Sequence, residues 1–124
     1  MATTTYKVLA QTGSSGSSGN GSATLSATTN TNLYTVPAST QTVVSTITIC
    51  NQASTAGTFR IAVRPSGATI AAQHYLAYDT PIAANDTITL TLGVTLTNGG
   101  TGDSVVVYAS SANMSFHAYG SQLA

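Results

Sequence analysis

The segment TFRIAVRP, residues 58–65, alternates between apolar residues and polar or small ones. Its apolar positions are Phe59, Ile61 and Val63. A period of two residues is typical of a half-buried antiparallel strand, and a proline followed by the turn residues SGA ends the run. The segment therefore predicts a strand that has one face in a core and presents Arg60 and Arg64 on the other.

Similar patterns extend outward from this strand over most of the chain. Alternating or β-branched segments occur at 5–10, 23–27, 32–36, 40–51, 72–81, 86–93, 105–110 and 114–120. No window shows apolar residues at helical spacing. About seven to nine short strands separated by turn residues predict one all-β domain over residues 1–124. We expect a single antiparallel β-sandwich of jelly-roll or immunoglobulin-like type, with a small closed barrel as the alternative.

Alternation also assigns side chains to faces within these strands. In 72–81 it groups Tyr78 with the side of Leu76, opposite Tyr75. In 40–51 it places Val43, Ser45, Ile47 and Ile49 in one register.

One low-complexity stretch, GSSGSSGNGS at 13–22, interrupts the pattern. Its composition is that of a flexible coil, so we expect a Gly/Ser-rich loop at 12–22. A cloning scar normally lies at a terminus, which favours a natural long loop between the leader and the rest of the domain.

Charged residues make up 5% of the 124 residues, and the formal net charge is zero. Soluble globular proteins average roughly 25% charged residues. Three basic side chains cannot neutralise several phosphates, so nucleic acid is not an expected partner. No run reaches the roughly 18 apolar residues of a membrane span, and the N-terminus lacks the pattern of a signal peptide. A surface with so little charge suits a protein inside an assembly.

The residue types needed for catalysis or metal binding are scarce. The chain has no Glu, no G-x-S-x-G motif and no zinc-ligand spacing. The three Asp residues, 79, 86 and 103, stand at expected turns, where they cap backbone groups. We interpret His74 and His117 as strand residues and the single Cys50 as a small buried hydrophobe. We therefore expect a protein that is not an enzyme, with no catalytic residue, cofactor or metal.

Five side chains are candidates for an interface with another subunit. Tyrosine and arginine are the residue types that most often anchor interfaces. The candidates are Arg60, Arg64, Tyr75, Tyr108 and Tyr119. The alternative is that the tyrosine rings are buried in the sandwich with their hydroxyls at its edge.

Several segments together resemble a group of small virion structural proteins of tailed bacteriophages. They are the leader MATTTYKVLAQ, LYTVP (33–37), VVSTITICN (43–51), FRIAVRP (59–65), HYLAYDTPI (74–82), NDTITLTLG (85–93) and the closing VVVYAS and MSFHAYGS. The resemblance implies a structural subunit of the virion, made in the host bacterial cytoplasm. It would pack against copies of itself, as a homo-oligomer such as a trimer, and against other virion proteins.

The resemblance favours the tail side of the particle, at the baseplate or at fibre attachment. One alternative is a head decoration or cement protein that stabilises the capsid. A second is a carbohydrate-binding module for host recognition, with a host glycan stacked on tyrosine rings. The absence of Trp counts against that second alternative.

Overall fold

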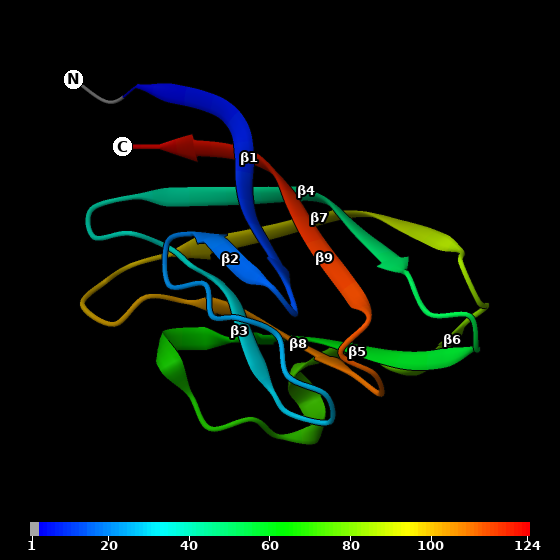
Figure 1. Ribbon diagram of the computed structural model, residues 1–124. Coiled ribbons are helices and arrows are strands. Elements are labelled where there is room, and N and C mark those ends of the chain that lie inside the picture. The colour runs from blue at the N-terminus through cyan, green and yellow to red at the C-terminus, as the bar shows by residue number, and fades with distance from the viewer. Residues whose placement is uncertain (1–2) are drawn as a thin grey trace.

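The computed structural model describes residues 3–124 as nine strands and two short 3-10 turns (Figure 1). The strands are β1 (Thr4–Gly13), β2 (Gly16–Gly19), β3 (Thr31–Thr35), β4 (Gln41–Asn51), β5 (Gly57–Arg64), β6 (Tyr75–Ile82), β7 (Thr87–Thr97), β8 (Ser104–Ala109) and β9 (Met114–Leu123). The 3-10 turns are η1 (Pro65–Gly67) and η2 (Ala72–His74), both between β5 and β6.

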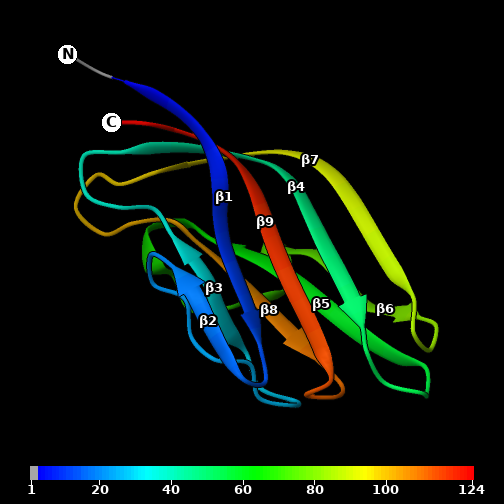
Figure 2. The same cartoon turned by 45° about the horizontal axis from the view of Figure 1, so that its top comes forward.

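The strands form two antiparallel sheets that face each other (Figure 2). Sheet A has the order β2-β1-β9-β4-β7, and sheet B has the order β3-β8-β5-β6. Apart from β2, the strands pair in a nested way: β1 with β9, β3 with β8, β4 with β7, and β5 with β6. Nested pairing distributed over two sheets is the jelly-roll arrangement. The predicted all-β sandwich is confirmed, and of the two types expected it is the jelly roll.

The core lies between the sheets and is built from the inward residues of both. Its largest side chains are fully buried and include Phe59, Ile61, Ile47 and Ile49. Phe59 of sheet B meets Phe116 of sheet A edge to face, with ring centroids 6.4 Å apart. The alternation in 58–65 thus predicted the inward face of β5 correctly.

A buried polar group closes the end of the sandwich near the chain termini. Tyr34 is fully buried, and its Oη lies 2.8 Å from Thr42 Oγ1. Gln122 Nε2 donates a second hydrogen bond to the same oxygen. The phenol therefore joins β3 of sheet B to β4 and β9 of sheet A, and a buried hydroxyl of this kind is costly to leave unpaired.

We expect Tyr34→Phe to lower the free energy of unfolding by about 1–2 kcal/mol, because Thr42 and Gln122 each lose a partner. Urea denaturation followed by circular dichroism measures the change. Adding Thr42→Val should recover part of the loss, since one orphaned hydroxyl is then removed. A Tyr34→Phe variant as stable as the parent would contradict the assignment of this network.

The Gly/Ser run differs from the expected loop. Residues 16–19 form β2, which pairs with the end of β1 in a hairpin with Gly13 opposite Gly16. Backbone pairing with β1 needs no side chains, so a polar, Gly-rich composition does not prevent it.

The expected strand at 23–27 is absent. There the chain makes isolated backbone hydrogen bonds, from Ala23 N–H to Asn32 O and from Leu25 N–H to Gly13 O.

Register shifts account for the other face assignments that were wrong. A shift between Val44 and Thr46 in β4 turns Val43 outward, where it is 40% exposed, and buries Val44 instead. In β6 the pairing with β5 shifts twice, and Asp79 has a φ of 48°. Strict alternation is lost at such irregularities. Cys50 also departs from expectation, since it is only partly buried.

Candidate binding surfaces

The charged side chains all lie away from one broad face of the molecule, the outer face of sheet A. On β9, Ala118 is fully buried, so its neighbour Tyr119 points outward, as do Ser121 and Leu123 further along. Residues paired across the sheet share a face. The rows across this outer face are Thr97–Gln41–Leu123–Thr4, Thr95–Val43–Ser121–Tyr6, Thr91–Thr46–Tyr119–Val8, Thr89–Thr48–His117–Gln11 and Thr87–Cys50–Ser115. None of these residues is Asp, Glu, Lys or Arg.

One end of this face carries four exposed apolar side chains and the partly buried Tyr119, which together we call the terminal patch. It consists of Tyr6, Val8, Val43, Tyr119 and Leu123. Tyr6 is 85% exposed and Val8 is 49% exposed. The start of β1 and the end of β9 lie side by side here (Figure 1), and Thr3 and Ala124 exchange backbone hydrogen bonds. Contiguous exposed apolar side chains of this kind mark interaction sites in soluble proteins.

The outer face of sheet B carries a different feature, a cluster of aromatic rings around Arg60. The Arg60 guanidinium lies 4.2 Å from the ring centroids of both Tyr78 and Tyr108. Its Nε donates to Asp79 Oδ1 at 2.6 Å, and Nη2 donates to Oδ2 at 3.3 Å. Tyr75 meets Tyr78 edge to face at 4.9 Å. We call these five residues the Arg60 cluster.

Arg60 is held within the Arg60 cluster by two hydrogen bonds to Asp79. The hydrogen bonds to Asp79 raise the pKa of the Arg60 guanidinium further above its ordinary value, so it stays charged at any pH at which proteins fold. Its two faces are occupied by tyrosine rings. The cluster is therefore an aromatic surface around an arginine that is already paired with Asp79.

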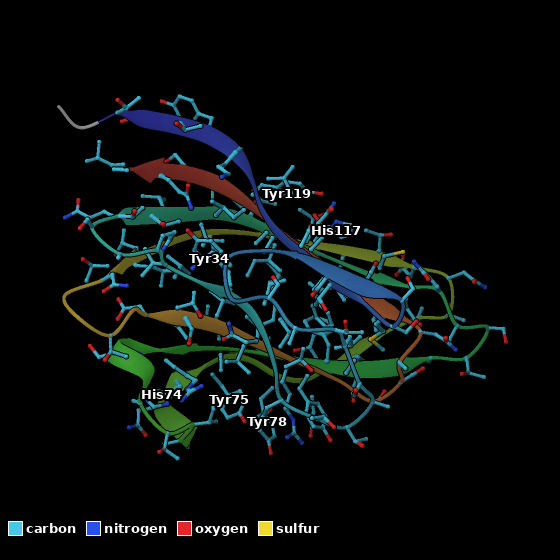
Figure 3. The ribbon with its side chains drawn as sticks, turned by 60° about the vertical axis from the view of Figure 1, so that its left-hand side comes forward. Tyr34, His74, Tyr75, Tyr78, His117 and Tyr119 are labelled. Atoms are coloured by element: carbon cyan, nitrogen blue, oxygen red, sulfur yellow. The ribbon has the colours of Figure 1, made fainter. Side chains whose placement is uncertain are left out.

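The five interface candidates from the sequence divide between the two sheets. Arg60, Tyr75 and Tyr108 come together in the Arg60 cluster, whereas Arg64 donates to the backbone carbonyls of Gly67 and Ala68 in its own loop. Tyr119 lies on sheet A and stacks on His117. Figure 3 shows His117 and Tyr119 on the opposite side of the molecule from Tyr75 and Tyr78.

Sequence reasoning missed Tyr78, Asp79 and every member of the terminal patch except Tyr119. Exposed Tyr6 and Val8 follow the same alternation as buried strand residues, and nothing local distinguishes the two. Tyr78 was assigned away from Tyr75 because alternation does not reveal the shift in β5–β6 pairing between Tyr75 and Ala77, which puts both tyrosines on one face.

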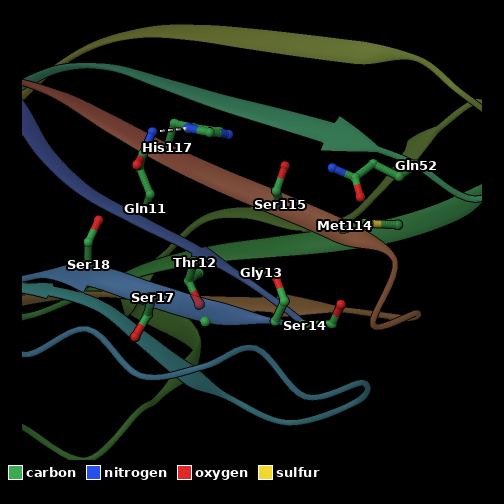
Figure 4. Close-up of a pocket in the computed structure, with 12 residues that line it drawn as sticks. Gln11, Thr12, Gly13, Ser14, Ser17, Ser18, Gln52, Met114, Ser115 and His117 are labelled. Atoms are coloured by element: carbon green, nitrogen blue, oxygen red, sulfur yellow. Dashed lines mark hydrogen bonds between the residues drawn. The ribbon is translucent and has the colours of Figure 1, made fainter.

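A polar hollow of about 360 Å³ lies beside the Gly/Ser hairpin (Figure 4). It is lined by backbone and side chains of Gln11, Ser115, His117 and the hairpin residues. Gln11 Nε2 and His117 Nδ1 are 3.0 Å apart, so each already has a partner. A second hollow, of about 480 Å³, has an apolar lining of Ile70, Ala71, Ala72, Tyr75 and Tyr78 on the other sheet.

Groups suited to metal or proton chemistry are scattered. Among residues 3–124, no three His, Cys, Asp or Glu side chains come close enough together to hold a metal ion. His74 Nδ1 accepts the Ala71 N–H within η2. Asp86 accepts from Thr87 N–H, and Asp103 accepts from the N–H groups of Ser66 and Thr97, as expected for turn residues. The expectation was wrong for Asp79, which lies within β6 and pairs with Arg60. No helix in the described part of the chain is long and apolar enough to cross a membrane.

Comparison of the chain with protein-family models, with curated proteins and with solved structures finds no match. The class of protein is defined by the fold and the surfaces alone: it is an antiparallel jelly-roll domain with one broad uncharged face.

Proposed function

We propose that this protein is a structural subunit of a tailed-phage virion. It acts without catalysis, by packing against copies of itself and against other virion proteins at the tail baseplate or fibre attachment. The resemblance of its strand segments to small virion proteins supplies the setting. The observation that carries the packing role is the uncharged outer face of sheet A with the terminal patch at its end.

The physical basis is the small free-energy cost of removing such a face from water when another subunit packs on it. Burying a charged side chain without a partner is expensive, whereas threonine methyls, valine and tyrosine rings gain from leaving water. Interfaces with a charge-depleted centre derive their affinity from desolvated area. On a free monomer the terminal patch would leave Tyr6, Val8 and Leu123 in contact with water.

Labelling of intact particles tests this proposal. A gold-conjugated antibody against the chain, viewed by electron microscopy, should label the tail tip of particles from the phage that encodes it. Label spread over the head would favour the decoration or cement alternative. Particles that carry no label, in preparations where the antibody detects the free protein, would refute a virion role.

Carbohydrate binding is the second candidate, and the hollow beside Tyr75 and Tyr78 favours it. A sugar site combines an aromatic platform with several convergent polar groups. Here the apolar hollow lies on sheet B and the polar hollow lies on sheet A, so neither has both elements. Glycan-array binding that is lost in Tyr78→Ala would support this second function over pure packing.

A further inference from the structure

Three of the four sheet edges are blocked against pairing with another strand. On sheet A, β2 is only four residues long and pairs with β1 only over 10–13. The rest of that edge, residues 4–9 of β1, carries the charged side chain of Lys7. On sheet B, β3 is covered by the segment before it, through backbone bonds from Ala23 N–H to Asn32 O and from Thr35 N–H to Asn20 O. At the other edge of sheet B, β6 contains Pro81 and the irregular Asp79. Short strands, covering segments, proline and charge are the usual devices that protect edges.

The fourth edge, β7, has no proline, charge or covering segment over 88–96, and the one irregularity of its pairing with β4 lies at Leu92 and Gly93. The strand is 11 residues long, pairs with β4 on one side, and contains no proline and no charged residue. Asp86 and Asp103 accept the N–H groups of Thr87 and Thr97 at its two ends. No turn or loop backbone group bonds to residues 88–96, so the backbone groups that point away from β4 there are unpaired.

The side chains of β7 are also only partly buried or exposed. The inward row of Ile88, Leu90, Leu92 and Val94 packs on the core but is only partly buried. The outward row is threonine and is exposed. A strand added at this edge would satisfy the free backbone groups and extend the apolar row at the same time.

We propose that β7 pairs with β7 of a second copy of this chain, antiparallel about a two-fold axis, so that sheet A continues from one copy into the other. When a strand pairs with its own copy, its side chains lie beside side chains of the same sequence. A charged strand would meet its own charge there, whereas β7 meets only threonine, glycine and aliphatic residues. The carboxylates of Asp86 and Asp103 lie outside the paired segment and are hydrogen-bonded to backbone.

The contact between two β7 edges is small. A strand of 11 residues is about 37 Å long, and two stacked sheets are about 10 Å apart. The edge therefore offers several hundred Å² per copy, at the lower end of specific interfaces. We expect a dimer with a dissociation constant in the micromolar range.

Sedimentation velocity over a concentration series tests the pairing with the full chain. Thr91→Lys places a lysine on the exposed row of β7, close to the same lysine of the second copy, and should raise the dissociation constant roughly tenfold or more. Ser17→Lys, on the opposite edge strand of the same sheet, is the matched control and should leave dimerisation unchanged. Circular dichroism of both variants confirms folding.

A cross-linking series gives a second measurement that does not depend on a lysine. In a Cys50→Ser background, cysteine is introduced singly at Thr89, Thr91 or Thr95 and the protein is mildly oxidised. Antiparallel pairing brings the residue nearest the two-fold axis within disulfide distance of its copy, so one position should cross-link far faster than the others. A monomer at 100 micromolar, a trimer, or a dimer that Thr91→Lys does not weaken would overturn the proposal.

The pairing of β7 rests on the proposed function only for its role in the virion. Experiments can refute the pairing and the virion role independently. A monomeric protein that labels particles would refute β7 pairing and leave the virion role intact. A β7 dimer in solution with no label on particles would do the reverse.

Discussion

Replacing Phe59 with alanine is expected to lower the free energy of unfolding by about 4 kcal/mol. Phe59 and Phe116 are both fully buried, and they come from opposite sheets. Removing one ring leaves a cavity between the sheets and exposes the edge-to-face partner, which adds a cavity cost to the lost transfer energy. Domains of this size are typically stable by about 5–15 kcal/mol, so the loss is a large share of the total.

Chemical denaturation gives the value, and Phe59→Leu is the matched control. Leucine keeps most of the volume and should cost less than about 1.5 kcal/mol. Alanine at both positions should cost less than the sum of the single changes, since the pair contributes roughly 0.5–1.5 kcal/mol beyond area burial. A Phe59→Ala variant destabilised by less than about 1 kcal/mol would show that the sheets do not meet at this pair.

The second large effect is expected at Gly120, in the middle of β9. A Cβ at this position would lie 1.9 Å from the carbonyl oxygen of Val43 on β4. The oxygen belongs to backbone, so relief requires β4 and β9 to separate beside the β4 bulge. We expect Gly120→Ala to cost about 3 kcal/mol and to lower the melting temperature by roughly 10 °C.

Gly93 provides the control for Gly120, because it lies in β7 of the same sheet and a Cβ there meets nothing within 4 Å. Gly93→Ala should change stability by no more than about 0.5 kcal/mol. Equal melting temperatures for the two alanine variants would contradict the close approach of β4 and β9.

Local periodicity was enough to predict the fold class. Strands such as β5 alternate between apolar and polar residues. A sandwich or a barrel is the architecture that buries the apolar faces of so many strands. The nested pairing that makes this a jelly roll is a long-range property. No local pattern indicates that β1 lies beside β9 rather than beside β3.

Surface features were harder to predict, because their residues depend on register. Val43 and Val44 are adjacent and alike, and the bulge after Val44 decides which of them is buried. The Arg60 cluster was found in part, since Arg60 and Tyr108 face each other across regular strands. Tyr75 and Tyr78 share a face because the pairing of β6 with β5 shifts between Tyr75 and Ala77. The uncharged face of sheet A required the complete pairing of β1, β9, β4 and β7.

A cryo-electron microscopy reconstruction of the intact particle tests the virion role most directly. We predict density for this jelly roll at the tail, with the outer face of sheet A and its terminal patch covered by neighbouring subunits. A particle resolved throughout that contains no such domain, or one in which the outer face of sheet A points into solvent on every copy, would contradict the account.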